Sequence, residues 1–191
     1  RIGEYLASGM MMLASATTPG ALATAYTEAL NTVRWAYWRE TEQVRSATIV
    51  AASQSVIADR VTAIAGAMAA VEPVDRKRVE AAYLGRCAAI GVTPVVDPPP
   101  TPEEQDAARL VPTMKPPAPG SGGPGGPGGV GGGGGRGPSD APPTLSGYYA
   151  SEARGMADGV RSILDIRGAI SAEFGPVGID RVVAFFRAAE Q

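Results

Sequence analysis

The sequence predicts a mainly α-helical protein, in which a long-helix hairpin or bundle is followed by a disordered Gly/Pro tether and then by a small tri-helical unit. Three observations support this fold class. Apolar residues recur at intervals of three and four over most of the chain, which is the period of an amphipathic helix. Capping pairs such as Thr18-Pro19 and Thr101-Pro102 occur where such runs begin. Residues 116–144, between the two helical parts, are mostly Gly and Pro.

The tether divides the chain because it cannot contribute to a core. Gly loses the most backbone entropy on ordering, Pro lacks the amide donor, and Val130 is the one sizeable apolar side chain in the tract. We therefore expect four segments: an alanine-rich helical region at 1–96, a Pro-rich connector with a short helix at 97–115, the tether at 116–144, and a small helical unit at 145–191.

Composition excludes several classes of chemistry within this chain. The formal net charge is −2 and no segment is strongly basic, so polyanion binding has no electrostatic support. The chain has no histidine and a single cysteine, Cys87, which excludes Ser-His and Cys-His catalysis, ordinary zinc sites and an internal disulfide. Glu40 and Glu42 face away from each other on a helix and do not form a catalytic pair. We therefore predict no catalytic, cofactor-binding or metal-binding residue.

The first helix is expected over residues 1–16, with a buried stripe made of Ile2, Tyr5, Leu6, Gly9, Met10 and Leu13. The run Met10-Met11-Met12 is interpreted as core packing rather than as a metal site. The chain opens on Arg1 within this helix, and not on methionine, so we expect a fragment. No signal peptide or transmembrane run is visible in the sequence.

A long helix is predicted from Pro19, with Thr18 as N-cap, to Glu72, where Pro73 should end it. One apolar stripe comprises Leu22, Tyr26, Leu30, Val33, Tyr37 and Val44, and a second, out of register with it, comprises Val50, Ile57, Ile64 and Val71. An unbroken helix over 19–71 would span about 80 Å. We therefore expect either a bend near residues 39–48 or packing along a partner surface.

Trp35 and Trp38 overlap on one broad face of this helix, where they are either buried or line a partner groove; burial is the preferred interpretation. The next helix is predicted from Asp75 to Ile90 with Gly91 as C-cap, and its buried face should comprise Val79, Ala82, Tyr83, Cys87 and Ile90. Arg76-Lys77-Arg78 is interpreted as a solvated run, and Cys87 as inert packing. Thr101-Pro102-Glu103-Glu104 predicts a short helix that reaches Leu110.

Three short helices are predicted after the tether. The first covers Tyr148 to Met156, and a turn at Asp158-Gly159 and a bridge of strand at Val160-Arg161 follow it. The second begins at the cap Ser162 and buries Ile163, Ile166, Ile170 and Phe174, and the third buries Ile179, Val182, Val183 and Phe186. These are helix-turn-helix proportions. The charges of Asp180, Arg181, Arg187 and Glu190 cancel on the last helix, which argues against DNA reading.

The run DGVRSILDIRGAISAEFGPV at Asp158–Val177 resembles the winged-helix-type appendage of some bacterial proteins of the di-zinc aminopeptidase family (peptidase family M-twenty-eight). Its opening is also similar to the peptide-binding chaperone of pyrroloquinoline quinone biosynthesis. The run RIGEYLASGMMMLAS is similar to the last helix of the peptidase domain. The resemblance implies that the zinc ligands and the general base lie upstream, so no catalytic residue can be placed on this chain, and that the wing strands would follow Gln191.

This resemblance implies a non-catalytic C-terminal region of a secreted or periplasmic metallo-aminopeptidase-like protein, with zinc in the parent domain alone. Such a region would pack on the upstream peptidase domain and bind a peptide or a partner protein. One alternative is a helical protein-interaction module without a hydrolase parent, and a further one is a winged-helix DNA-binding module. Neither a nucleic acid nor a membrane is expected as partner.

Overall fold

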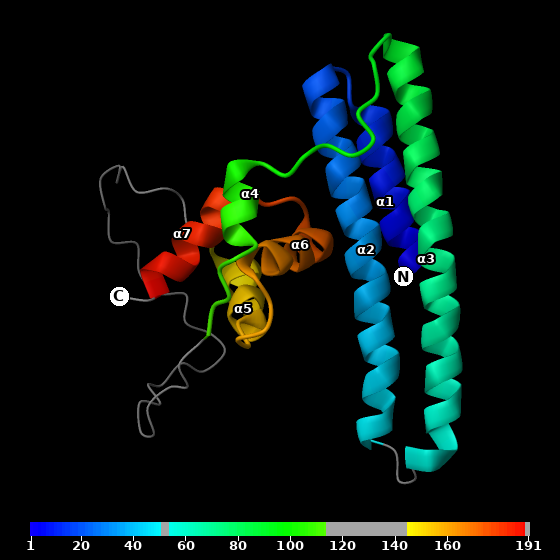
Figure 1. Cartoon of the computed structure of the whole chain (residues 1–191), viewed down its shortest axis with the longest axis vertical. Helices are drawn as coiled ribbons and strands as arrows, with labels where there is room; N and C mark the ends of the chain where they lie inside the picture. Colours follow the sequence, from blue (N-terminus) through cyan, green and yellow to red (C-terminus); the bar gives the residue numbers. More distant parts are fainter. Residues whose placement is uncertain (51–53, 114–144, 190–191) are drawn as a thin grey trace. The chain divides into compact units, whose positions relative to one another are not determined.

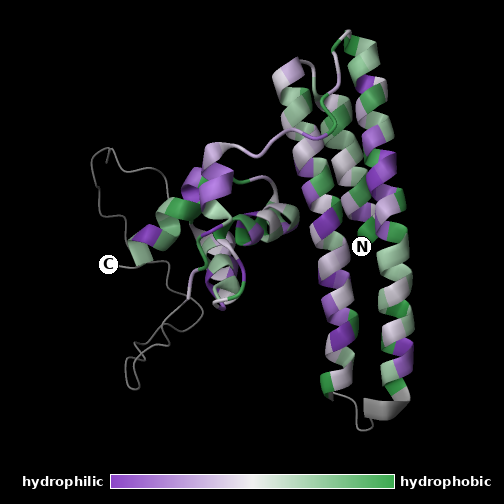
Figure 2. Ribbon diagram, viewed as in Figure 1, coloured by the Kyte–Doolittle hydropathy of each residue, from purple (hydrophilic) through white to green (hydrophobic). Residues whose placement is uncertain are grey.

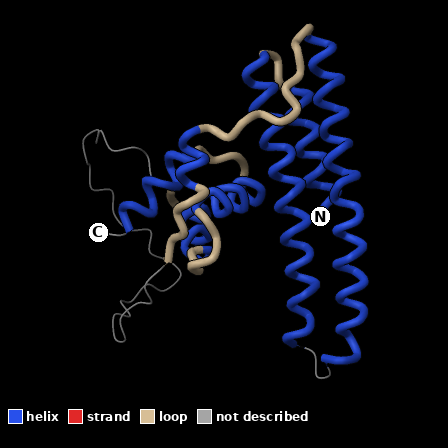
Figure 3. Tube along the Cα trace, viewed as in Figure 1, coloured by secondary structure: helices blue, strands red, loops and turns tan. Residues whose placement is uncertain are grey.

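A computed structural model describes residues 1–50, 54–113 and 145–189. These residues form helices α1 (Ile2–Ser15), α2 (Pro19–Val50), α3 (Gln54–Ile90), α4 (Pro102–Ala107), α5 (Gly147–Met156), α6 (Ile163–Phe174) and α7 (Ile179–Ala189), and no strand occurs among them (Figures 1 and 3). The predicted fold class is confirmed. The tether predicted at 116–144 lies outside the described residues.

The chain divides into two compact units. Unit 1 comprises Arg1–Thr101 and Arg167–Val177, and unit 2 comprises Pro102–Ile166 and Gly178–Gln191. Helix α6 is shared between them, since its first turn belongs to unit 2 and the remainder to unit 1.

Unit 1 is built on an antiparallel hairpin of α2 and α3, and α1 packs along one part of that hairpin (Figure 1). A Cβ atom at Gly9 would lie 3.1 Å from the Cβ atom of Ala29, so the missing side chain lets the two backbones approach closely. Near the start of α1, Tyr5 accepts a hydrogen bond from Arg39 at 3.5 Å. Because α1 and α2 run in opposite directions, α1 accompanies α2 only as far as about residue 40.

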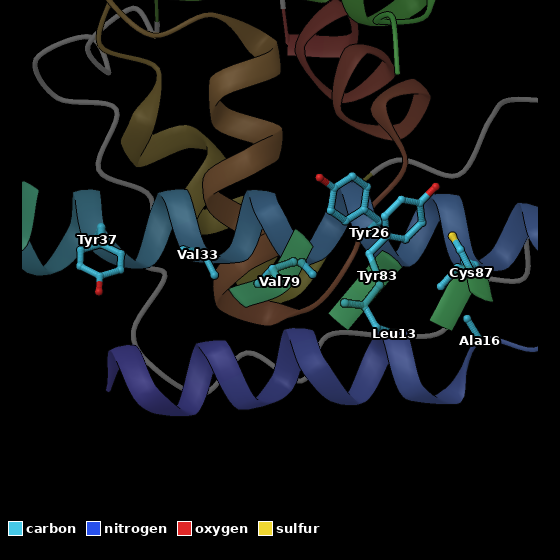
Figure 4. Packing of buried hydrophobic residues seen from close by; sticks show 10 residues of the cluster. Leu13, Ala16, Tyr26, Val33, Tyr37, Val79, Tyr83 and Cys87 are labelled. Carbon is cyan, nitrogen blue, oxygen red and sulfur yellow. The ribbon is translucent and has the colours of Figure 1, made fainter. Parts of the chain in front are cut away.

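The core of unit 1 lies between α1, α2 and α3 along this shared part (Figure 4). The rings of Tyr26 and Tyr83 stack with centroids 4.0 Å apart and planes at 9°. The other buried members are Leu13, Ala16, Leu22, Ala29, Val33, Tyr37, Val79 and Cys87. Full burial of a Leu- or Val-sized side chain stabilises by roughly 1.5–3 kcal/mol. The core prediction for Leu13, Val79, Tyr83 and Cys87 is therefore confirmed.

The long helix predicted to continue from Pro19 to Glu72 is wrong in its length. Its start is confirmed, because Thr18 Oγ1 accepts a hydrogen bond from the amide of Ala21 at 3.3 Å. Residues 39–48 lie within the continuous helix α2, and the chain reverses only after Val50. Folding back buries the first apolar stripe against α3, whereas a single rod would leave it exposed, and tertiary burial outweighs local helix continuity.

The predicted helix end at Pro73 is also wrong, because Pro73 lies inside α3. An interior proline removes one helical hydrogen bond and costs about 3 kcal/mol. Burial on both sides of the proline offsets this cost: the Tyr37 hydroxyl donates to Asp75 at 2.6 Å, and Val79 is fully buried. The helix does end where predicted, since Gly91 adopts φ +68° and the amide of Val92 donates to Cys87 O at 2.9 Å.

Residues Arg167–Val177 pack against α2 within unit 1. Arg167 pairs with the buried carboxylate of Glu28, and its Nε donates to Val177 O at 2.8 Å. Asn31 Nδ2 donates to Gly168 O at 3.0 Å. Two side chains of α2 thereby hold this segment, because Glu28 pairs with Arg167 and Asn31 satisfies the Gly168 carbonyl.

Trp35 and Trp38 of α2 pack within the protein, in agreement with the preferred interpretation that they are buried. Trp35 is buried and Trp38 half-buried, and their rings meet edge to face with centroids 5.1 Å apart. A Cβ atom at Gly168 would collide with the Trp35 indole nitrogen, so the glycine makes room for the ring. Phe174, predicted to face inward, is 36% exposed; this part of the prediction is wrong.

Unit 2 contains α4, α5, α7 and the first turn of α6. Its buried apolar side chains include Ala107, Leu145, Ala150, Ala153, Ile163, Ile166, Val182, Phe185 and Phe186. Helix α4 packs against α7, and the Arg154 guanidinium lies 5.1 Å from the ring centre of Phe185. The predicted burial of Ile163, Ile166, Val182 and Phe186 is confirmed.

The segment after α4 pairs with the loop before α6. An antiparallel bridge joins Thr113 to Asp158, and the amide of Ile163 donates to Leu110 O at 2.8 Å. The bridge predicted at Val160-Arg161 is therefore wrong. The amide of Val160 turns back to the Asp158 carboxylate at 2.9 Å, and such a local side-chain bond takes the donor away from strand pairing.

The polar residues of the motif at Asp158–Asp165 have local structural roles. The carboxylate of Asp158 accepts the Arg161 amide at 3.0 Å and the Arg161 guanidinium at 2.6 Å. These backbone donors lower the pKa of Asp158. Ser162 and Asp165 form a reciprocal cap: Ser162 Oγ accepts the Asp165 amide at 3.1 Å, and Asp165 accepts the Ser162 amide at 3.2 Å. This motif therefore starts α6.

Candidate interaction surface

One side of α3 changes from buried to partly exposed halfway along the helix. Val79, Tyr83 and Cys87 are at most 3% exposed. Towards the start of α3 the same side continues at intervals of four and three, but there Ile64 is 46% and Val71 is 47% exposed. The members of this continuation are Ile57, Val61, Ile64, Met68 and Val71. The change falls where α1 no longer accompanies the hairpin (Figure 1).

The facing side of α2 shows the same change. Leu22, Val33 and Tyr37 are buried, whereas Val44 and Thr48 are only half-buried. The two sides still face each other, because Thr41 Oγ1 donates to Met68 Sδ at 3.5 Å. We call the whole set the distal surface: Glu40, Val44 and Thr48 on α2 with Ile57, Val61, Ile64, Met68 and Val71 on α3.

The helices that carry the distal surface have few charges. Residues 46–58 and 61–71 contain no Asp, Glu, Lys or Arg. Around the rest of its circumference this part of α3 exposes mainly Ala and Gly, at Ala58, Ala63, Gly66, Ala67, Ala69 and Ala70 (Figure 2). A helix without a polar face is normally covered by protein on more than one side. Among the described residues of unit 1, α2 packs against one side of this part of α3.

Glu40 occupies the position on α2 between Tyr37 and Val44, at the boundary of the distal surface. Its Oε1 atom is buried and has no hydrogen-bond partner among the described residues. The neighbouring cations have carboxylate partners: Arg39 pairs with Glu173, and Arg45 pairs with Glu42 at 2.8 Å. A buried carboxylate oxygen without a donor costs about 1–3 kcal/mol or more.

A polar pair, Tyr37 and Asp75, also lies at this boundary, at the edge of the core that α1, α2 and α3 share. The hydroxyl of Tyr37 donates to Asp75, which is buried and also pairs with Arg78 at 2.7 Å. Burial and this hydrogen bond raise the pKa of Tyr37 to about 12. These groups satisfy one another, whereas Glu40 Oε1 has no hydrogen-bond partner among the described residues.

Two hollows lie elsewhere among the described residues. One, of about 350 Å³, is lined in unit 1 by Met10, Leu13, Ala14, Ala82, Gly85, Arg86 and Ala89. Arg86 is engaged there, because it donates to Ala16 O at 2.8 and 3.1 Å and caps α1. The other, of about 150 Å³ in unit 2, is lined by Leu110, Val111, Pro112, Ile163, Phe186 and Arg187. Neither hollow contains a pair of groups suited to acid–base or nucleophilic chemistry.

The residues that the sequence analysis considered as possible functional sites are either packed in the structure or exposed to solvent. Cys87 is buried and free, and the run Arg76–Arg78 is exposed. Within the run Met10–Met12, Met11 is 66% exposed and the other two are half-buried, so the core interpretation is correct for two of the three. Among the described residues no group of His, Cys, Asp or Glu is arranged to hold a metal ion.

The sequence analysis did not predict the distal surface. The available signal was the seven-residue repeat of Ile57, Ile64 and Val71, within which Asp59 and Arg60 are the charged residues. The sequence analysis interpreted it as a second stripe on a long helix that either bends or packs along a partner surface. None of the described helices combines the length and the apolar character needed to cross a bilayer.

Comparison with protein-family models, with curated proteins and with solved structures finds no match.

Proposed function

We propose that this chain is a non-catalytic helical interaction module that docks a partner on the distal surface of the α2–α3 hairpin. The observation that carries the proposal is the loss of burial along one side of α3, from Val79 at 0% to Ile64 at 46% exposed. The seam has coiled-coil spacing, and α1 covers one half of it, so the other half presents an apolar face of the kind that binds a helix.

The partial exposure of several neighbouring apolar residues supports a binding role. Single exposed apolar residues are normal on a protein surface, but a contiguous apolar patch marks an interaction site. Ile64 and Val71 lie on the same side of α3, and Val44 lies on the facing side of α2. The low charge of the region removes the desolvation cost that would oppose docking.

A helical peptide library displayed on phage, selected against the full chain, tests this proposal. Binders should lose affinity for the variant Ile64→Gln and keep it for Leu84→Gln. Leu84 is a matched control because it lies on the same helix, beyond the distal surface, and is 37% exposed. Failure to enrich any binder, or binders indifferent to Ile64→Gln, would refute docking at this surface.

A second candidate keeps the hydrolase parent: the chain is the non-catalytic C-terminal region of a secreted metallo-aminopeptidase-like protein, and its helices pack on the peptidase domain. Its support is the motif Asp158–Val177 and the resemblance of the first helix to the end of a peptidase domain. The reading frame ahead of Arg1 tests it. Histidine and aspartate zinc ligands encoded shortly upstream would support this parent, and an upstream start codon without them would exclude it.

A further inference from the structure

We infer that the hollow between α1 and α3 docks a helix of a partner protein, and that this helix places a carboxylate beside Arg86. The site is separate from the distal surface, so the inference goes beyond the proposed function. Three features carry it: an apolar hollow in unit 1, a glycine inside α3 that the packing of the chain does not explain, and an arginine whose donors are only partly used.

The hollow has two low, apolar walls. Its volume is about 350 Å³, and all of its lining residues come from α1 and α3. On α3, Ala82, Gly85 and Ala89 follow one another at intervals of three and four, so they lie along one side of the helix. Met10 and Ala14 belong to the facing wall on α1. Walls built of such small residues let another helix approach closely.

Gly85 lies inside α3, which continues to Ile90. Glycine destabilises a helix interior relative to alanine, so its presence there calls for a reason. The reason at Gly9 is internal, because a Cβ atom at Gly9 would lie 3.1 Å from the Cβ atom of Ala29. A Cβ atom at Gly85 would meet nothing within 4 Å. The space over Gly85 is therefore available to the backbone of another helix.

Arg86 supplies the charge of the hollow. The Nε and Nη2 atoms of this half-buried side chain donate to Ala16 O at 3.1 and 2.8 Å, which fixes the guanidinium at the end of α1. Its Nη1 atom carries two more donors and has no hydrogen-bond partner among the described residues. The other lining residues of the hollow are uncharged. A carboxylate matches the charge and the planar fork of a guanidinium.

These features specify the partner. The wall from Ala82 to Ala89 extends over about 10 Å at 1.5 Å per residue, which is about two turns of a helix. A partner helix with an apolar residue over Gly85 and an Asp or Glu one turn away fits this wall. Gly85 and Ala89 are exposed, whereas a site for a small molecule normally encloses most of its ligand. A helix is therefore favoured over a small apolar acid.

The helical peptide library displayed on phage and selected against the full chain also tests this inference. Clones that bind at the hollow should bind the variant Gly85→Leu about tenfold or more weakly, because the leucine side chain fills the hollow. Gly66→Leu is the matched control: Gly66 also lies inside α3 with nothing within 4 Å of its Cβ position, and it does not line the hollow. Thermal melts should show both variants at least as stable as the parent, since leucine favours a helix more than glycine does.

Synthetic peptides of the hollow-dependent clones test the charge. Replacing their Asp or Glu with the corresponding amide should weaken binding about fivefold in fluorescence anisotropy. The difference between acid and amide should disappear in Arg86→Gln and persist in Arg78→Gln. Arg78 is a suitable control because it lies on the same helix, pairs with Asp75 and does not line the hollow.

Four outcomes would overturn the inference: no clone distinguishes Gly85→Leu from Gly66→Leu, acid and amide peptides bind equally, the chain forms a dimer that Gly85→Leu dissociates, or decanoate raises the melting temperature of the parent but not of Gly85→Leu. The third would assign the hollow to a second copy, and the fourth to a small acid. Clones sensitive to Ile64→Gln but not to Gly85→Leu would support the proposed function alone, so the two proposals fail separately.

Discussion

Replacing Tyr37 with phenylalanine tests whether the buried Tyr37–Asp75 hydrogen bond stabilises unit 1. The bond is 2.6 Å long, and both side chains are buried, at 4% and 5% exposure. Phenylalanine keeps the ring and removes only the hydroxyl. Asp75 then retains its ion pair with Arg78, whose side chain is largely exposed.

The hydrogen bond to the carboxylate sets the magnitude of this change. Hydrogen bonds to a charged group contribute about 1.5–3 kcal/mol to the free energy of unfolding. The rise in the pKa of Tyr37 to about 12 is caused first by burial, so it sets the pH dependence of the effect and not its size at pH 7. We therefore expect Tyr37→Phe to lower the free energy of unfolding at pH 7 by about 2 kcal/mol.

The pH dependence has a definite sign. Because folding raises the pKa of Tyr37, the stabilisation is complete below pH 10.0 and is lost as the pH rises towards about 12. The pKa values of Tyr26 and Tyr83 are raised as well, chiefly by burial, so the native protein and the variant both weaken in alkali. The difference between the two proteins isolates Tyr37, and it should shrink across this window.

Urea unfolding followed by tryptophan fluorescence measures the effect, because both tryptophans of the chain lie on α2 and report on unit 1. Tyr148→Phe on α5 is the control, since Tyr148 is 80% exposed and its loss should change stability by less than about 0.5 kcal/mol. The reasoning is refuted if Tyr37→Phe costs no more than this control at pH 7, or if the difference persists undiminished to pH 12.

Three further substitutions probe packing and capping. Leu13→Ala should lower the free energy of unfolding by about 2–5 kcal/mol in urea titrations, because the side chain is 2% exposed; a loss under 1 kcal/mol would mean that α1 is not part of the core. Gly9→Leu should destabilise unit 1 by about 1–3 kcal/mol through overpacking, while Gly3→Leu, with no atom within 4 Å of its Cβ position, should not; equal effects in thermal melts would argue against close α1–α2 contact. Ser162→Ala should cost about 0.5–2 kcal/mol by removing the cap shared with Asp165, seen as faster amide exchange in the first turn of α6; unchanged exchange would exclude the cap.

Local signals in the sequence predicted the helices and their caps because those features depend on near neighbours. Thr18 before Pro19, Gly91 after Ile90 and Ser162 before Ile163 each satisfy backbone groups within a few residues. The periodic burial of Val79 and Tyr83 follows in the same way from the geometry of one helix. The exclusion of histidine-dependent chemistry needed only the composition.

Tertiary contacts decided the features that no local signal encodes. Pro73 remains inside α3 because the Tyr37–Asp75 bond and the burial of Val79 outweigh the loss of one helical hydrogen bond. The chain reverses after Val50, and not at a bend near residues 39–48, because two out-of-register stripes become one core only when α2 and α3 fold together. The distal surface depends on the same packing: the spacing of the seam is written in the sequence, but the exposure of Ile64 depends on how the helices pack together, which is a relation between helices and not a property of any one of them.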